Sequence, residues 1–304
     1  MTILLLGANG QLGQELQRAL APLGTIVATT RSGALPDGSA CEVADFDQPA
    51  SLAALLDRVQ PTVVVNAAAY TAVDRAEGDR DAAFRANAEA PGVLAQWCAQ
   101  AGVPLVHYST DYVFDGQGTR PYREDDATAP LGVYGASKLA GEQAIRAAGG
   151  RHLIFRTAWV YASHSANFLR TMLRVGAERD VLRVVADQVG TPTPAALIAD
   201  VTAQALQHPG QLSGTWHLTA SDQTSWHGFA EAIFDEALAI GELAKVPAVE
   251  AISSSEYPTQ AKRPAWSVLD NRRLQQDFGI ELPPWQDGLS RVLAELASAR
   301  AQLL

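Results

Sequence analysis

The sequence predicts an α/β fold in which helices cover both faces of a parallel sheet, followed by a smaller C-terminal lobe. Short apolar runs alternate with segments of helical periodicity through the first half of the chain, which is typical of a doubly wound sheet. A glycine-rich turn joins the first apolar run to the first helical segment. After residue 157 prolines become frequent and the regular segments become shorter, which suits a substrate-binding lobe.

The expected strands are nearly continuous apolar runs, because strands of a parallel sheet are buried on both faces. In chain order they are residues 3–6, 25–29, 62–66, 105–108 and 152–157. The expected helices have apolar residues at helical spacing, and Gly102 is a stop signal for the third of them. In chain order these helices are residues 14–20, 51–59, 79–101, 134–147 and 200–208.

The glycine-rich turn has the pattern Gly7-x-x-Gly10-x-x-Gly13 between the first expected strand and the first expected helix. A pyrophosphate must approach backbone N–H groups at a helix N-terminus there, and larger side chains would block it. We therefore predict a Rossmann-type NAD(P)-binding domain over residues 1–157, with a segment near 181–210 returning to it. Residues 158–304 are expected to form mainly the substrate-binding lobe.

The end of the second expected strand carries Arg31 between hydroxyl side chains, where an NAD-binding protein usually has an acidic residue. An arginine favours the 2′-phosphate of NADPH over the free hydroxyl of NADH. The alternative is that Arg31 is a solvated loop residue. The sequence therefore predicts NADPH, with NADH as the second choice.

Bulk composition excludes several classes of protein. The chain has 304 residues, of which 47% are hydrophobic and 18% charged, with a net charge of −10. A non-specific nucleic-acid or anionic-membrane binder is not expected at that charge. Two cysteines, Cys41 and Cys98, are too few for a disulfide framework or a zinc site. With no signal-like or spanning segment, we expect a cytoplasmic enzyme without a structural metal.

Tyr134 and Lys138 lie four residues apart on an expected helix and so share one face of it. Thr110 follows the fourth expected strand, at the carboxyl edge of the sheet where ligands bind. Reduction of a carbonyl needs a proton donor beside the oxygen, and a lysine cation near a tyrosine lowers the pKa of its phenol. We therefore predict that Thr110, Tyr134 and Lys138 form a catalytic centre, against the alternative of an ordinary half-buried tyrosine and a surface lysine.

Several longer strings carry a resemblance that runs over essentially the whole chain. The string Ser-Thr-Asp-Tyr-Val-Phe at residues 109–114 is the most specific of them. It lies within residues 107–114, and the other strings are residues 7–13, 65–74, 133–142, 155–161 and 258–264. With these strings the chain resembles the extended short-chain dehydrogenases/reductases and, among them, the dTDP-4-dehydrorhamnose reductase family.

That resemblance implies reduction of a dTDP-linked 4-keto-sugar with NAD(P)H, and a role for each matching position. The cofactor-binding residues would be Gly7, Gly10, Gln11, Leu12, Gly13, Arg31, Asp45, Phe46, Ala67, Ala68, Ala69, Tyr108, Tyr134 and Lys138. The substrate-binding residues would be Thr110, Asp111, Tyr134, Trp159, Asn167 and Arg263. Some members dimerise and bind Mg²⁺ through an acidic residue of the first helix, so a homodimer and Mg²⁺ at its interface are implied, with Glu15 at that position.

Each of these assignments has a structural alternative. Asp45 could cap a turn, Asn167 could cap a helix and Trp159 could be a core residue. Arg263 could be a surface charge, and Glu15 a solvated carboxylate. At the level of function, the alternatives are another nucleotide-sugar epimerase, dehydratase or reductase of the same fold, or a non-catalytic subunit resembling the regulatory β subunit of methionine adenosyltransferase.

Overall fold

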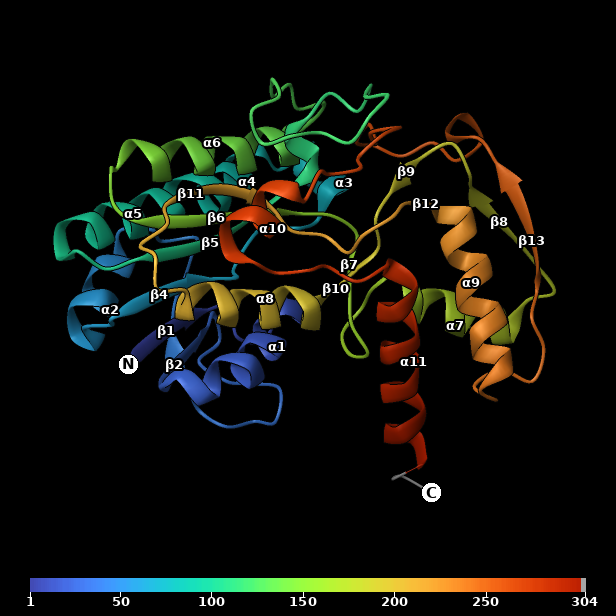
Figure 1. The fold of residues 1–304 in the computed structure, drawn as a ribbon, viewed down its shortest axis with the longest axis horizontal. Helices are drawn as coiled ribbons and strands as arrows, with labels where there is room; N and C mark the ends of the chain where they lie inside the picture. Colours follow the sequence, from blue (N-terminus) through green and yellow to red (C-terminus); the bar gives the residue numbers. More distant parts are fainter. Residues whose placement is uncertain (302–304) are drawn as a thin grey trace.

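The computed structural model describes residues 1–301, and a seven-stranded parallel sheet forms the middle layer of its larger part (Figure 1). The strand order is β11-β6-β5-β4-β1-β2-β3. The strands are β1 (Thr2–Leu6), β2 (Thr25–Thr30), β3 (Glu42–Val43), β4 (Val63–Asn66), β5 (Leu105–Thr110), β6 (His152–Thr157) and β11 (Gly214–His217). The chain leaves β1 toward one edge and later returns beside it as β4, so the sheet has a switch point between these strands. The predicted doubly wound parallel sheet is confirmed.

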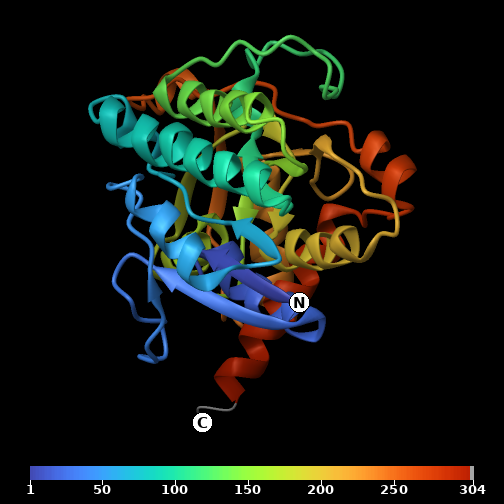
Figure 2. The same cartoon turned by 90° about the vertical axis from the view of Figure 1, so that its left-hand side faces the viewer.

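Helices cover both faces of this sheet (Figure 2). One face is covered by α1 (Gln11–Leu20), α8 (Ala195–Gln207) and α10 (Arg272–Phe278). The other face is covered by α2 (Ser51–Val59), α4 (Arg80–Phe84), the π-helical segment η2 (Arg85–Glu89), α5 (Ala90–Ala101) and α6 (Val133–Ala147). The segments α4, η2 and α5 follow one another without a break, and Gly102 ends α5 with φ +67°. The expected long helix over 79–101 is therefore confirmed.

The alternation of side chains along β1 shows why both faces need a cover. Ile3 and Leu5 belong to the core beneath α1 and α8, whereas Leu4 and Leu6 belong to the core beneath α2 and α5. All four side chains are fully buried. At about 25 cal/mol per Å² of buried apolar surface, such runs supply much of the driving force for folding.

The smaller lobe lies at one end of the sheet (Figure 1). Its main helices are α7 (Phe168–Glu178), α9 (Trp226–Ala239) and α11 (Trp285–Ala301). Its strands are β7 (Val160–Tyr161), β8 (Val181–Val185), β9 (Val189–Gly190), β10 (Thr193–Pro194), β12 (Thr224–Ser225) and β13 (Ala248–Ile252). Three two-stranded sheets result, β10-β7, β12-β9 and β13-β8. The short segments α3 (Val73–Ala76), η1 (Ala21–Leu23), η3 (Asp111–Val113) and η4 (Ser254–Glu256) complete the described elements.

The segment that returns to the large sheet begins later than the sequence predicts. Residues 195–217 supply α8 and β11, and β11 pairs with β6. Residues 181–185 remain in the lobe, because β8 pairs in parallel with β13 and not with the large sheet. None of the helices between residues 1 and 301 combines the length and apolar character that a membrane span requires.

Candidate active site

A cleft of about 740 Å³ opens at the carboxyl ends of β1, β4 and β5. Most predicted cofactor-binding residues line it, namely Gly7, Gly10, Gln11, Leu12, Arg31, Asp45, Phe46, Ala67, Ala68, Ala69, Tyr108, Tyr134 and Lys138. Among further lining residues that the sequence reasoning did not assign are Asn9, Thr30, Asp47, Asn66, Tyr70, Thr71, Arg75 and Ser109. Asn66, Tyr70 and Thr71 lie at or just after the carboxyl end of β4. That position in the sequence could have identified them as cleft residues.

The glycine loop leaves the first turn of α1 open toward this cleft. Gly7 has φ +78°, a conformation that side chains rarely adopt. Gly10 is the N-cap of α1 in an extended conformation, and no side chain caps the helix there. The N–H groups of the first turn are thus available to an anion. Gly13 does not line the cleft; a Cβ there would lie 2.0 Å from the Gly7 carbonyl oxygen.

Replacement of Gly13 and of Gly10 by alanine should therefore have different effects on stability and on cofactor binding. Gly13→Ala is expected to destabilise the fold by about 3 kcal/mol, because the methyl group overlaps backbone atoms. At Gly10 the nearest atom to an added Cβ is 3.4 Å away, so Gly10→Ala should change stability by less than about 0.5 kcal/mol. It should still weaken NADPH binding, because the methyl group occupies the anion position. Urea denaturation and fluorescence titration with NADPH measure the two effects, and an equal loss of stability would contradict the assignment.

The loop after β4 is held in place by Asn87 of the π-helical segment. Asn87 Oδ1 accepts from the Tyr70 N–H at 2.8 Å, and its Nδ2 donates to the Tyr70 carbonyl at 3.0 Å. Nδ2 also donates to Ser137 Oγ of α6 at 3.0 Å. Asn87 is fully buried. One amide thereby ties the cleft wall at residues 66–72 to the helix that carries Tyr134.

Tyr134 and Lys138 project from the same face of α6 into the cleft. Burial of the phenol raises the pKa of Tyr134 to about 12, although the neighbouring Thr110 hydroxyl acts in the opposite direction. The structure thus brings Thr110 beside Tyr134, as predicted. Lys138 Nζ donates to the Tyr108 carbonyl at 2.6 Å, and burial lowers the pKa of Lys138 to about 8. The expected lowering of the tyrosine pKa by the lysine is absent from this arrangement, because the lysine nitrogen is directed to β5.

Thr110 is the buried link between Tyr134 and an acidic neighbour. Its hydroxyl donates to Asp111 Oδ1 at 2.9 Å, and it accepts from the Tyr112 N–H at 3.3 Å. Burial raises the pKa of Asp111 to about 6, although the Thr110 and Ser267 hydroxyls lower it. The Tyr112 ring packs edge-on against the Tyr134 ring with centroids 5.4 Å apart.

Arg263 reaches the same region from the lobe. Its Nη2 donates to Asp74 Oδ2 at 2.6 Å, and the Ala261 N–H donates to the other oxygen of Asp74. The positive charge of Arg263 opposes the burial that raises the pKa of Tyr112. Its Nη1 is buried without a hydrogen-bond partner among the described residues. Arg263 is therefore an ion-paired, largely buried side chain and not the surface charge of the alternative.

Trp159 lies just after β6, in a strained backbone conformation with φ +48°. Its ring stacks on Trp226 of α9, with centroids 3.6 Å apart and planes at 7°. A Cβ on Gly190 would lie 2.6 Å from Trp159, so the stack requires glycine at that position. The stack joins the large sheet to the lobe, and Trp159 remains partly exposed.

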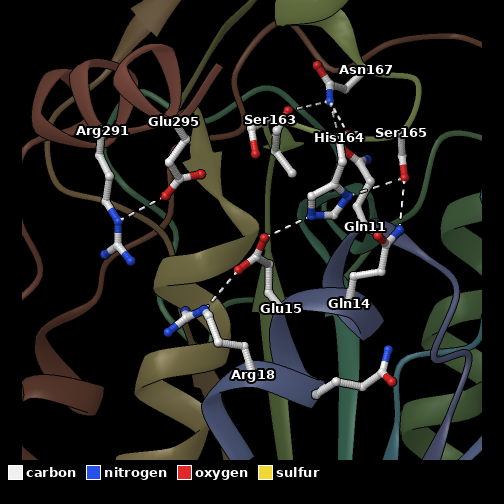
Figure 3. A network of polar contacts seen from close by, with 12 residues as sticks. Gln11, Gln14, Glu15, Arg18, Ser163, His164, Ser165, Asn167, Arg291 and Glu295 are labelled. Carbon is white, nitrogen blue, oxygen red and sulfur yellow. Dashed lines mark hydrogen bonds and ion pairs between the residues drawn. The ribbon is translucent and has the colours of Figure 1, made fainter. Parts of the chain in front are cut away.

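Asn167 is the N-cap of α7 and also a link to the glycine loop (Figure 3). Its Oδ1 accepts from the Arg170 N–H at 3.0 Å. Its Nδ2 donates to Gln11 Oε1 at 2.9 Å and to the Ala162 carbonyl at 2.8 Å. The helix-cap alternative therefore describes this side chain, and its substrate contact stays a prediction.

Asn167→Ala is expected to cost about 1 kcal/mol of stability, as for the loss of an N-cap, and to weaken NADPH binding because Gln11 loses its partner. Ser225→Ala is the matched control. Ser225 caps α9 by accepting from the Gly228 N–H at 3.0 Å, and it does not contact the glycine loop in this structure. Thermal denaturation should show a loss for both variants, larger for Asn167→Ala because the Nδ2 bonds are also removed, and only Asn167→Ala should raise the Kd for NADPH.

Glu15 has protein partners for its carboxylate. His164 Nε2 lies 2.8 Å from Oε1, and Arg18 Nε lies 3.3 Å from Oε2 (Figure 3). In the part of the chain that the structure describes, no group of three or more His, Cys, Asp or Glu side chains could hold a metal ion. The implied Mg²⁺ site thus gains no ligand set within one chain.

Comparison with known proteins places this site in a family. The family model described as RmlD substrate binding domain matches residues 1–298. The chain belongs to the RmlD family of dTDP-4-dehydrorhamnose reductases. Curated relatives with that name include one from Burkholderia thailandensis, 48% identical over 98% of this chain and 100% of the relative, and one from Shigella flexneri, 45% identical over 99% and 100%.

Solved structures agree with this family assignment. The dTDP-4-dehydrorhamnose reductase from Bacillus anthracis, solved in complex with NADP, is 33% identical and superposes with a TM-score of 0.87 over 97% of this chain and 99% of that one. A relative from Clostridium acetobutylicum is 35% identical, with a TM-score of 0.88 over 98% and 100%. The predicted family is confirmed.

Proposed function

We propose that this member of the RmlD family reduces the 4-keto group of dTDP-4-dehydro-L-rhamnose to give dTDP-L-rhamnose. The observation that carries the proposal is that Thr110 lies beside Tyr134, which lines the cleft, in a chain that matches these reductases over nearly its full length. Relatives under this name include a structure with NADP, whose reduced form is the hydride donor that a carbonyl reduction consumes.

The residues of the cleft fit a nicotinamide dinucleotide. Gly7, Gly10 and the small side chains Ala67–Ala69 leave room that larger side chains would fill. The open N-terminus of α1 suits the pyrophosphate, and Asp45 and Phe46 suit the adenine end. When bound, the reduced cofactor supplies the hydride that carbonyl reduction requires.

Tyr134 donates the proton. Because burial keeps its pKa at about 12, the phenol is protonated at neutral pH and acts as the acid. The phenol O–H bond breaks as the proton passes to the carbonyl oxygen of the sugar, and the phenolate then takes a proton from solvent. Thr110 orients that oxygen, and Lys138 holds the ribose beside the nicotinamide.

For the substrate, we propose that Asp111 binds a sugar hydroxyl and that Trp159 forms an apolar wall of the sugar pocket. We propose that Arg263, whose Nη1 has no hydrogen-bond partner among the described residues, meets the diphosphate. Asn167 acts at the same lobe as the N-cap of α7 and through its hydrogen bond to Gln11.

NADPH is the proposed reductant, with Arg31 at its 2′-phosphate. Arg31 is exposed at the cleft and pairs with Asp47, Nη1 to Oδ2 at 3.3 Å. The nearby carboxylate can accept from a ribose hydroxyl, so NADH should also be used. Arg31→Ala is expected to raise the KM for NADPH about tenfold and to leave the KM for NADH within about twofold. Steady-state assays with both cofactors measure this, and an equal rise in both constants would contradict the assignment.

The proposed function is tested by following NADPH and NADH oxidation with a set of nucleotide-linked 4-keto-sugars. Turnover with dTDP-4-dehydro-L-rhamnose, and slower turnover when the base is changed, is the expected result. Interconversion of sugars without net cofactor consumption would instead identify an epimerase or dehydratase. No turnover, together with copurification of a larger partner enzyme, would support a regulatory subunit. Light scattering with and without Mg²⁺ tests the implied homodimer.

A further inference from the structure

Lys138 Nζ is the last of three buried nitrogen-bearing groups in a row, and the other two, Asn66 and His107, have no role in the proposed chemistry. Asn66 Nδ2 lies 3.1 Å from His107 Nδ1, and His107 Nε2 lies 3.4 Å from Lys138 Nζ. The three residues are at most 2% exposed. The three residues come from β4, β5 and α6, and the two outer ones, Asn66 and Lys138, line the cleft.

The hydrogen-bond partners of Asn66 determine where His107 carries its proton. Asn66 Oδ1 accepts from the Ala68 N–H at 3.1 Å, so the amide nitrogen faces His107 and donates to Nδ1. Burial and the neighbouring Lys138 hold the pKa of His107 well below its usual value, so the imidazole is neutral. With Nδ1 as the acceptor, the single ring proton is on Nε2.

His107 therefore points an N–H at Lys138. An uncharged amine can accept that hydrogen bond with its lone pair, whereas an ammonium group has only donors. Turning the Asn66 amide over would not remove the conflict, because its nitrogen would then face the Ala68 N–H. In either arrangement a charged Lys138 leaves two donors facing each other, at a cost that burial increases.

The other groups around Lys138 act in different directions. Glu142, one turn further along α6, favours the charged lysine, but its carboxylate is bound by Arg156 at 2.7 and 2.8 Å. Tyr134 lies one turn earlier on α6. On β5 the Tyr108 carbonyl accepts from Nζ, and the Tyr108 hydroxyl is bonded to Thr202 of α8 at 2.9 Å.

We propose that Asn66 locks His107 in the tautomer that presents Nε2–H to Lys138, and that this pair positions the lysine while disfavouring its charged form. His107 and Asn66 are thus positioning residues that act through Lys138. The consequence for Lys138 in catalysis rests on the proposed function, but the effect on its protonation does not.

The test reads Lys138 directly by NMR titration of protein labelled with [ε-¹³C]lysine, in the absence of nucleotide and substrate. The chain has three lysines, Lys138, Lys245 and Lys262, and Lys138→Arg assigns the resonance. We expect a midpoint of about 8 for Lys138. A midpoint near about 10.4, as for an ordinary lysine, would overturn the proposal.

Two variants remove the N–H that His107 directs at Lys138, one by replacing His107 and the other by replacing Asn66. In His107→Gln the amide oxygen can accept from an ammonium group, so the Lys138 midpoint should rise by about one pH unit, a tenfold gain in proton affinity. In Asn66→Leu nothing donates to Nδ1, so the ring proton can move there and Nε2 can accept from Lys138, which should raise the midpoint without adding a charge. This second variant keeps the test decisive if the first does not fold.

His217→Gln is the matched control. His217 is also fully buried, and its Nδ1 faces the Tyr122 carbonyl at 3.0 Å, away from Lys138. The Lys138 midpoint should be unchanged in this variant. An equal shift in His217→Gln and His107→Gln, or no shift in His107→Gln and Asn66→Leu, would overturn the proposal. Because no substrate is present, these outcomes are independent of which keto-sugar the enzyme reduces.

Discussion

Tyr134→Phe should lower kcat for keto-sugar reduction by about 10²- to 10⁴-fold, the usual contribution of a positioned proton donor, while NADPH still binds. The variant removes only the phenol oxygen, which is where the proton leaves. NADPH oxidation at saturating substrate measures the loss, and fluorescence titration measures cofactor binding. Because the pKa of Tyr134 lies at about 12, the acid form persists through neutral pH. Titration of this tyrosine should therefore not lower activity as the pH falls from 8 to 6.

Tyr161→Phe is the control for the same substitution away from the chemistry. Tyr161 is a buried residue of the lobe core, and its hydroxyl has no hydrogen-bond partner among the described residues. Its removal should leave kcat within about twofold, because no hydrogen bond is lost. A Tyr134→Phe enzyme that turns over like Tyr161→Phe would exclude Tyr134 as the proton donor.

The features that the sequence predicted correctly depend on local patterns. The strand, the glycine turn and the helix from residue 3 to residue 20 are consecutive, so spacing alone describes the glycine-loop end of the cleft. Tyr134 and Lys138 are one helical turn apart, and helix geometry places them together. Their position after β5 follows from the rule that ligands bind at the carboxyl ends of parallel strands.

The features that the sequence did not predict depend on contacts between distant residues. His107 stands inside a quoted string, but its tautomer depends on Asn66, 41 positions earlier. Asn87 binds the Tyr70 backbone from a π-helical segment, which the apolar periodicity of the sequence does not predict. An asparagine such as Asn167 can bind a ligand or cap a helix, and the sequence does not distinguish these roles. Its hydrogen bond to Gln11, 156 positions away, shows that it also contacts the glycine loop.

Replacing Glu142 should have the largest effect on stability. Its carboxylate is fully buried and receives two hydrogen bonds from Arg156, whose side chain is 3% exposed, at 2.8 and 2.7 Å. Glu142→Gln leaves that guanidinium buried beside a neutral amide, which should cost about 3–5 kcal/mol. Chemical denaturation measures the loss. As control, Glu295→Gln removes a solvent-exposed partner of Arg291 on α11 and should change stability little.

The pH dependence of stability gives a second measure of the same ion pair. Burial alone would raise the pKa of Glu142, but the bonds and charge of Arg156, with help from Ser109 and Arg146, lower it below its usual value. A carboxyl whose folded-state pKa is lowered stabilises the fold at neutral pH and loses that contribution as the pH falls through the folded pKa. Wild-type stability should therefore fall more steeply below pH ~4 than that of Glu142→Gln.

A double variant separates the net value of the pair from the penalty of an unpaired charge. Glu142→Met with Arg156→Met removes both ions and replaces them with apolar side chains of similar length. Because desolvation offsets much of the attraction in a buried pair, the double variant should be more stable than Glu142→Gln. If the double variant is the less stable of the two, the hydrogen bonds that Arg156 makes beyond Glu142, including the one to the Glu124 carbonyl at 3.4 Å, outweigh the unpaired charge in holding β6 against α6.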